Sequence, residues 1–265
     1  MKPTAVSEAH ARYLKTIRRN TRLVRLARIG ILIGFVLLWE LGADLRWFDP
    51  FILSSPSRIL ATVVRLYSDG SLWLHIGTTL LETVLGFLLG TLLGALFAVL
   101  LWWLPRLNRI LDPYLVVLNA LPKIALGPVL IVWFGAGMTS IVVMGVLVSL
   151  VVTTVTVLNG FLAATDEKQL LMRTLGATKL QIFTKVVLPS GIPDLISALK
   201  ISVGMSWVGV IVGEYLVSKA GLGYLIVYGG QVFKLDLVMA SVMILCVLAA
   251  LMYYAVALLE KKVRK

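Results

Sequence analysis

The chain has 265 residues, of which 59% are hydrophobic and only 14% are charged. An ordinary globular domain is about 45–50% apolar, so this composition excludes an ordinary soluble domain and predicts helices that span a bilayer. The formal net charge of +12 does not indicate nucleic-acid binding, because the basic residues lie at the ends of apolar segments. The single cysteine, Cys246, excludes a disulfide framework within the chain.

A basic leader, residues 1–28, precedes the first apolar segment and contains one acid, Glu8. Its arginines recur at helical spacing, so we expect a cytoplasmic leader that lies on anionic lipid, with a regulatory role as the alternative. The segment after Arg28 has no clean small-residue exit before Asp44, so it is interpreted as an uncleaved first span rather than a signal peptide.

Six apolar segments predict an all-α polytopic membrane bundle. They cover residues 29–45, 78–104, 113–134, 138–161, 194–217 and 236–259, within a permease-like domain over 29–260 that is followed by a tail, 261–265. With the N-terminus inside, the cytoplasmic pieces hold 18 of the 25 basic residues and the outer pieces hold 5, while Lys123 and Lys200 lie within spans. This bias predicts that both termini and the polar stretch 165–194 are cytoplasmic.

The outer loop 46–77 is expected to contain an amphipathic helix that begins near Pro56. His75 is interpreted as a satisfied polar residue rather than a ligand. Glu82 is a functional candidate because it is an acid within a span.

Glycines and prolines mark two places of unusual helix packing. Gly86, Gly90 and Gly94 predict close approach of a neighbouring helix, with a dimer contact as the alternative. Pro122 and Pro128 must open at least one turn of the third span. The break forms either part of a translocation pathway or a packing kink.

Small and hydroxylated residues form one stripe on the fourth span and one on the fifth. These stripes either pack tightly or line a narrow polar route. The candidate pathway residues, from the stripes and the break, are Pro122, Pro128, Ser149, Thr153, Thr156, Ser202, Ser206 and Gly209. Lys123 and Lys200 either attract an anion, pair with a carbonyl or reach the interface.

Motifs for chemistry are missing from the sequence. There is no phosphate-binding Gly-x-x-x-x-Gly-Lys-Ser/Thr loop, no His-Glu-x-x-His and no Gly-x-Ser-x-Gly elbow. The ionisable residues within spans are dispersed, and the repeated halves of a secondary transporter are not evident. The chain is therefore not expected to be an enzyme, and neither a cofactor nor a metal is expected. A membrane enzyme, an assembly factor and a simple channel are the remaining alternatives.

The polar stretch 165–194 predicts a helix over 166–175, a turn at Gly176, a second helix over 178–187 and a stop at Leu188-Pro189. This stretch resembles the cytoplasmic "EAA" loop of ABC importer permeases, which reads Glu-Ala-Ala, three residues, Gly, nine residues, Ile-x-Leu-Pro. Aligned on Gly176, the isoleucine position is Val186 and Leu-Pro matches. The Glu-Ala-Ala positions depart from the pattern, since they hold Leu170, Leu171 and Met172.

Three further stretches resemble the nitrate, sulfonate and taurine branch of that family: LPKIALGPVLIVWFG, IPDLISALKISVGMSWVGVIVGEYL and AGLGYLI. The resemblance covers about residues 55–260. It implies a type I importer permease in a bacterial inner membrane, with two permease subunits (a homodimer is expected), two cytoplasmic ATPase subunits and an extracytoplasmic binding protein. The implied substrate is a small anion such as nitrate, bicarbonate, a sulfonate or taurine, and an aromatic or pyrimidine compound is the alternative.

The same resemblance implies that residues 166–175 form a coupling helix inserted into a groove of the ATPase, with Gly176 turning the chain and Pro189 ending the segment. The candidate coupling residues are Asp166, Glu167, Leu170, Leu171, Met172, Arg173, Leu175, Gly176, Ala177, Val186, Leu188 and Pro189.

Overall fold

The computed structural model describes residues 8–164 and 166–263. The first seven residues of the expected leader, Thr165 and the last two residues of the expected tail lie outside the described residues. Within these two ranges the chain is all-α, without a strand. Five of the described helices are long and apolar enough to cross a membrane, or six if one bent pair counts as a single span. The predicted all-α membrane bundle is confirmed.

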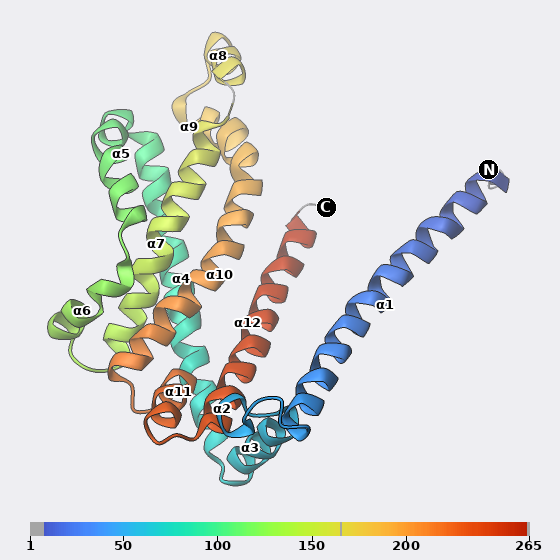
Figure 1. The fold of residues 1–265 in the computed structure, drawn as a ribbon. Helices are drawn as coiled ribbons and strands as arrows, with labels where there is room; N and C mark the ends of the chain where they lie inside the picture. The colour runs from blue at the N-terminus through green and yellow to red at the C-terminus, as the bar shows by residue number, and fades with distance from the viewer. Residues whose placement is uncertain (1–7, 165, 264–265) are drawn as a thin grey trace.

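The long helices are α1 (Glu8–Asp44), α4 (Ser71–Trp103), α7 (Met138–Leu162), α10 (Leu188–Val217) and α12 (Leu235–Val263). The shorter elements are α2 (Pro50–Leu53), α3 (Pro56–Ser68), α5 (Pro105–Ala120), η1 (Lys123–Leu126), α6 (Gly127–Phe134), α8 (Asp166–Thr174), α9 (Lys179–Ile182), η2 (Phe183–Val187) and α11 (Leu222–Gln231). Figure 1 shows α8 and α9 at one end of the bundle, called here the α8 end, and α2, α3 and α11 at the other, the α11 end.

The centre of the bundle is formed by α4, α7 and α10, which pack against one another along their lengths. Glycines allow this close approach. A methyl group on Gly209 of α10 would lie 2.8 Å from the Cα of Gly145 in α7, and one on Gly86 of α4 would lie 3.3 Å from the same Cα. The glycine repeat of α4 therefore serves close packing within the chain, as predicted.

The third predicted span is broken. The helical pair Pro105–Ala120 and Lys123–Phe134 bends by 89°. Pro122 lies at the break, as predicted, but Pro128 does not break a helix because it occupies the first turn of α6, where the missing N–H has no intrahelical partner to lose.

The predicted stop at Pro189 is wrong. The chain stays helical from Lys179 to Val217. The residues Phe183–Val187 form a π-helical turn, and the N–H of Leu188 bonds to the carbonyl oxygen of Phe183. Pro189 therefore falls in the first turn of α10, where the shifted bonding pattern accommodates a residue without a donor.

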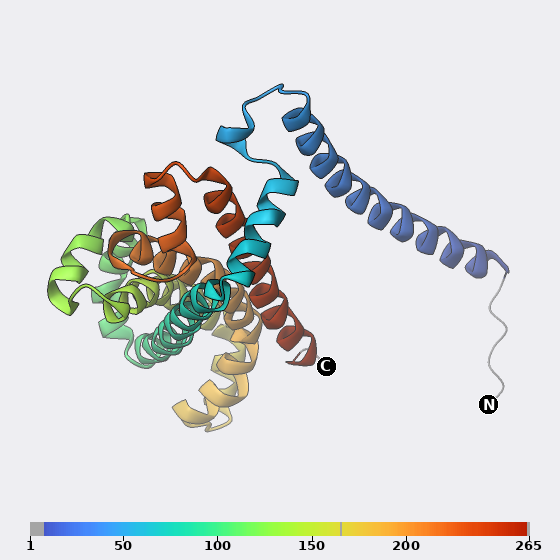
Figure 2. The ribbon, with the colours of Figure 1, turned by 90° about the horizontal axis from the view of Figure 1, so that it is seen from below.

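The boundary placed after residue 28 is not a structural break, because α1 runs continuously through it. Figures 1 and 2 show α1 standing apart from the bundle, with its C-terminal end close to α3. There, the N–H of Ser57 donates to Glu40 Oε2 at 2.9 Å. Most apolar side chains along α1 are exposed in the single chain, which suits a helix that faces lipid or a partner.

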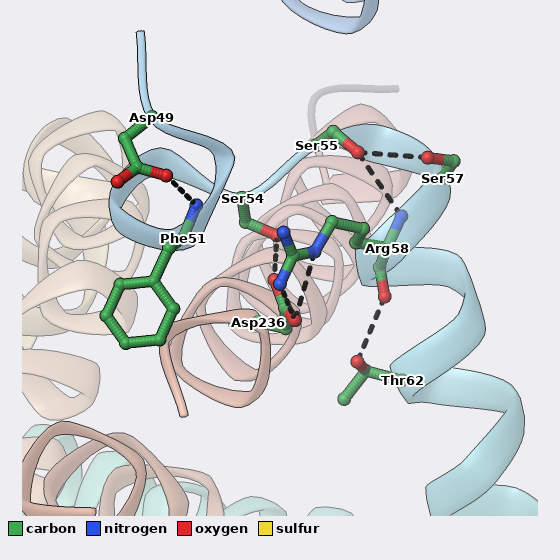
Figure 3. A network of polar contacts seen from close by, with 8 residues as sticks. All are labelled: Asp49, Phe51, Ser54, Ser55, Ser57, Arg58, Thr62 and Asp236. Atoms are coloured by element: carbon green, nitrogen blue, oxygen red, sulfur yellow. Dashed lines mark hydrogen bonds and ion pairs between the residues drawn. The ribbon is translucent and has the colours of Figure 1, made fainter. Parts of the chain in front are cut away.

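The α11 end is fastened by a polar network around Asp236, the acid in the first turn of α12 (Figure 3). Arg58 donates to Asp236 Oδ2 from Nε at 3.2 Å and from Nη2 at 2.8 Å, and Ser54 Oγ donates to Oδ1 at 2.8 Å. Ser55 caps α3, with Pro56 in its first turn, which confirms the expected helix in this loop.

Candidate functional site

The α8 helix projects beyond the ends of the long helices and terminates at a glycine turn. Gly176 has φ +77°, a left-handed conformation that favours glycine. Its N–H bonds to the carbonyl oxygen of Arg173 at 3.0 Å, and the N–H of Ala177 bonds to that of Met172 at 2.9 Å. These two bonds make a Schellman motif. The predicted helix and glycine turn are confirmed, and the turn fixes the angle between α8 and α9.

The α8 helix has one apolar face that the rest of the chain does not cover. Leu170, Leu171 and Leu175 are 62%, 60% and 74% exposed. The opposite face is attached to the bundle. Met172 packs against an apolar cluster at this end that includes Trp102, Phe161 and Phe183. Gln169 Nε2 donates to the carbonyl oxygen of Ala164 at 3.0 Å. An exposed apolar patch on a projecting helix is typical of a docking surface.

The next element, α9, is fixed by its cap and by a lysine. Thr178 and Gln181 form a capping box, in which each side chain bonds the backbone N–H of the other residue. Lys179 Nζ donates to the carbonyl oxygen of Trp103 at 2.5 Å and lies 5.7 Å from the ring centre of Trp102. These contacts hold α9 on the end of α4.

Aromatic side chains extend this attachment into η2. The Phe183 ring lies 4.9 Å from Trp102 of α4 and 5.6 Å from Phe161 of α7, measured between ring centres. Neither these aromatic residues nor Lys179 were among the contacts predicted from the sequence. The sequence did contain one signal for a special role of this end of the span, the Trp102-Trp103 pair, since tryptophan at a span end is typical of the membrane interface.

The predicted coupling residues divide between the two faces of this region. Met172, Ala177 and Leu188 pack against the bundle, and Val186 is half-buried. Asp166 begins α8. The remaining candidates are exposed: Glu167, Leu170, Leu171, Arg173, Leu175, Gly176 and Pro189. A cavity of about 450 Å³ separates α8 and α9 from α5; Asn108, Arg173 and Lys179 are among its lining residues.

Most of the predicted pathway residues lie inside the bundle. Ser149, Thr153, Ser202 and Ser206 are buried. The hydroxyl groups of Thr153 and Ser202 share a hydrogen bond of 2.6 Å between α7 and α10, and Ser149 Oγ donates to the carbonyl oxygen of Gly145 at 2.8 Å. Gly209 makes the close contact described above. The packing alternative therefore describes these five residues in this structure.

The other pathway candidates are more accessible. Thr156 is half-buried, while Pro122 and Pro128 are exposed at the bend between α5 and α6. Lys123 donates to the carbonyl oxygen of Asn119 at 3.0 Å, and Lys200 pairs with Glu260 at 2.5 Å. Carbonyl pairing is thus the alternative that the structure supports for Lys123.

The architecture is an apolar membrane helix bundle with a helix–turn–helix that projects from one end. The chain belongs to the family described as binding-protein-dependent transport system inner membrane component, whose model matches residues 86–265. It is therefore an ABC importer permease, which confirms the family predicted from the resemblance of the polar stretch 165–194.

The chain is similar over most of its length to three proteins that are each named as a transport permease. The chain is 33% identical over 235 residues to a probable ABC transporter permease protein of Haemophilus influenzae, covering 88% of this chain and 95% of that protein. It is 25% identical over 258 residues to the taurine transport system permease protein of Escherichia coli, covering 96% and 94%. It is 32% identical over 225 residues to the formylaminopyrimidine transport permease protein of Halalkalibacterium halodurans, covering 85% and 89%.

The fold is shared with a solved transporter. A chain of the MetNI methionine ABC transporter in an inward-facing conformation superimposes with a TM-score of 0.64 at 22% sequence identity, covering 76% of this chain and 98% of that chain. The type I importer permease fold is therefore confirmed.

Proposed function

We propose that this permease works in an ATP-driven importer in which a cytoplasmic ATPase subunit docks on α8. The observation that carries the proposal is the exposed leucine face, Leu170, Leu171 and Leu175. Full burial of one leucine side chain stabilises a contact by about 1.5–3 kcal/mol. An apolar groove on the ATPase would gain affinity by covering these side chains, and ATP hydrolysis would occur in that partner.

Movement of α8 would reach the membrane through a short and well-bonded connection. Gly176 and Ala177 close the Schellman turn, and the helical run from Lys179 to Val217 begins after one capping residue, Thr178. Since α10 packs closely on α7, a rigid-body shift at the ATPase would displace the centre of the bundle. Such a two-state displacement is how a transporter exposes its path to one side and then to the other.

We assign the α8 end to the cytoplasm. The N-terminal end of α1 and the C-terminal end of α12 point toward the α8 end in Figure 1. Among the described residues, the segments that adjoin that end hold 15 basic residues, and those at the α11 end hold 5. An excess of lysine and arginine in short segments marks the cytoplasmic side. The binding protein would then deliver substrate at the α11 end.

We also propose that two copies of the permease form the path, with the bend between α5 and α6 at their interface. Leu121 and Pro122 are exposed in the single chain and interrupt a helical pair that is long and apolar enough to form one span, which would place the break within the bilayer. Irregular backbone at that depth is tolerated where protein covers it or where it borders water. A second copy and a shared aqueous path would meet this requirement, and Pro122 and Pro128 would lie on that path.

A small organic anion, such as a sulfonate or taurine, is the proposed substrate. Its support is the similarity over nearly the full chain to the taurine permease of Escherichia coli. A pyrimidine compound is the second candidate, favoured by the 32% identity to the formylaminopyrimidine permease. Uptake assays with radiolabelled taurine and with a formylaminopyrimidine, in vesicles that contain the complete transporter, distinguish the two.

The docking proposal is tested by Leu171→Ala combined with Leu175→Ala. We expect ATPase subunits to co-purify at least tenfold less well, because tenfold corresponds to 1.4 kcal/mol, less than two leucines contribute. The control is Leu251→Ala, since Leu251 is 60% exposed, as Leu171 is, but lies on α12. Equal co-purification of the double variant and the control would exclude α8 as the docking helix.

The dimer proposal is tested by disulfide cross-linking in a Cys246→Ala background. Val132 on α6 is 83% exposed in the single chain. Val132→Cys is expected to give a cross-linked dimer on mild oxidation, whereas Leu251→Cys on α12 is not. Cross-linking at Leu251 without cross-linking at Val132 would move the interface to α12.

A further inference from the structure

Two glutamates from distant parts of the sequence meet inside the bundle near its α11 end. Glu82 of α4 is 2% exposed and Glu214 of α10 is 1% exposed. The two side chains converge on one point, because Thr79, one helical turn before Glu82 on α4, and Glu214 accept hydrogen bonds from the adjacent N–H groups of Leu222 and Gly223. Each also has one buried oxygen, Oε2 of Glu82 and Oε1 of Glu214, without a hydrogen-bond partner among the described residues.

Glu214 is at the same time a cap for α11. The N–H of Gly223 donates to Glu214 Oε2 at 2.6 Å, and the N–H of Leu222 donates to Thr79 Oγ1 at 2.7 Å. The N–H of Gly221 donates to His75 Nδ1 at 3.0 Å. The first N–H groups of a helix have no intrahelical partner, and α11 begins after Gly221, which has no side chain to cap it. Side chains of α4 and α10 therefore replace the missing cap.

This arrangement distributes charge unequally between the two carboxyl groups. Glu214 faces the N-terminus of α11, which favours a negative charge. The Thr79 hydroxyl group, which accepts from Leu222, is also able to donate its own hydrogen toward Glu214. Within the described part of the chain, no such donor faces Glu82. Two carboxyl groups in contact at a buried site cannot both carry a charge without a large cost, and one shared proton removes it.

We infer that Glu82 and Glu214 form a buried proton-binding site, in which the proton on Glu82 is donated to Glu214 and locks the N-terminus of α11 against α4 and α10. A hydrogen bond between the two carboxyl groups would supply a partner at a site where each of them has one buried oxygen without a partner among the described residues. The inference goes beyond the coupling proposal and does not depend on it. It gives α10 an attachment at each end, to α9 at the α8 end and to α11 at the other.

The groups that face this site are few. His75 contacts Gly221 and stacks on Tyr224 with 6.0 Å between ring centres. Tyr215 follows Glu214 on α10, and its side chain is exposed. The sequence of α7, which packs on both α4 and α10, contains no ionisable residue. On α12, Asp236 is already paired with Arg58. The carboxyl pair itself is therefore the group that accepts or releases a proton here.

Infrared spectroscopy of the full-length protein in lipid nanodiscs tests for the proton directly. At neutral pH we expect a carbonyl band of a protonated carboxylic acid that shifts in deuterated water and disappears in Glu82→Gln. Glu40→Gln is the control, because Glu40 lies on α1, outside the packed trio of α4, α7 and α10, and accepts a bond from Ser57, and it should keep the band. A wild-type protein without the band, or a band unchanged in Glu82→Gln, would overturn the inference.

Hydrogen exchange of the segment 221–224 tests the lock. Glu82→Gln retains a donor toward Glu214, so exchange should stay within about twofold of wild type. Glu82→Leu removes the donor and leaves Glu214 Oε1 buried without a partner, so exchange should rise at least tenfold. The isosteric Thr79→Val should raise exchange at Leu222 without loss of folding. If Glu82→Leu exchanges as slowly as Glu82→Gln, the pair serves packing only and the lock is wrong.

Discussion

Lys179 donates to the carbonyl oxygen of Trp103, the last residue of α4, at a distance of 2.5 Å. The ammonium group also lies 5.3 Å from the centre of the Trp103 ring. A lysine at the start of one helix thus satisfies an orphan carbonyl at the end of another and adds a cation–π contact. This pair joins the α8–α9 connection to α4.

We expect Lys179→Gln to lower stability by roughly 1.5 kcal/mol, the lower end for hydrogen bonds to charged groups, because the side chain is exposed. The ATPase should still bind, since the leucine face of α8 is unchanged, but substrate-stimulated ATP hydrolysis should fall. Lys185→Gln removes the same charge at another exposed position and is the control. Equal stimulation in both variants would contradict a role for the Lys179 contact in transmission.

Gly176→Ala should disturb the Schellman turn. A residue with a β-carbon in the left-handed conformation costs about 1–2 kcal/mol, and Gly176 has φ +77°. We expect α8 to fray and ATPase co-purification to fall several-fold while membrane insertion is unchanged. Gly204→Ala is the matched control, because a methyl group there meets nothing within 4 Å. A Gly176→Ala variant that binds ATPase as well as the control does would show that α8 docks without its cap.

The Thr153–Ser202 hydrogen bond predicts non-additive stability effects. Interhelical hydrogen bonds in membrane proteins contribute about 0.6 kcal/mol and at most about 1.7 kcal/mol. Thr153→Val and Ser202→Ala should each destabilise by that order, and the double variant by less than their sum, because the second substitution removes a group already left unpaired. Thermal unfolding in detergent of the wild type, the two single variants and the double variant measures these stability differences. Strict additivity would mean that the pair contributes no coupling.

Water-soluble thiol reagents test whether the buried hydroxyl stripes open during transport. Cysteines at Ser149 or Ser202, in a Cys246→Ala background, should be unreactive in the state described here, because both positions are fully buried. Reaction in one nucleotide state would mean that the α7–α10 contact separates and lines the path in that state. If the cysteines stay unreactive in every nucleotide state, the hydroxyl stripes serve helix packing only.

Asp236 is expected to contribute more to stability through its hydrogen bond with Ser54 than through its ion pair with Arg58. The Arg58–Asp236 ion pair is partly exposed, and such pairs contribute about 0–1 kcal/mol. Ser54, however, is 0% exposed and donates to Asp236. Asp236→Ala should therefore cost about 1–3 kcal/mol, whereas Arg58→Gln should cost less than about 1 kcal/mol. Thermal unfolding measures both, and equal losses would contradict the importance of the buried hydroxyl.

The sequence determined what depends on neighbours along the chain. Runs of apolar residues predict spans because the bilayer thickness sets the length of helix needed. Gly176 predicts a helix end because a left-handed cap suits glycine, and Pro122 predicts a break because proline lacks a donor and clashes with the preceding turn. These features, together with the resemblance of the polar loop, were sufficient for the family and the helical architecture.

The tertiary structure decided which side chains meet. Glu82 and Glu214 are 132 residues apart and became one site only when α4 and α10 packed together, since helical periodicity gives a face but not its partner. The same packing buried Ser149 and Ser202, which the stripe pattern alone left open. Pro189 did not end a helix, because a π-helical turn, invisible to capping patterns, shifted the bonding just before it.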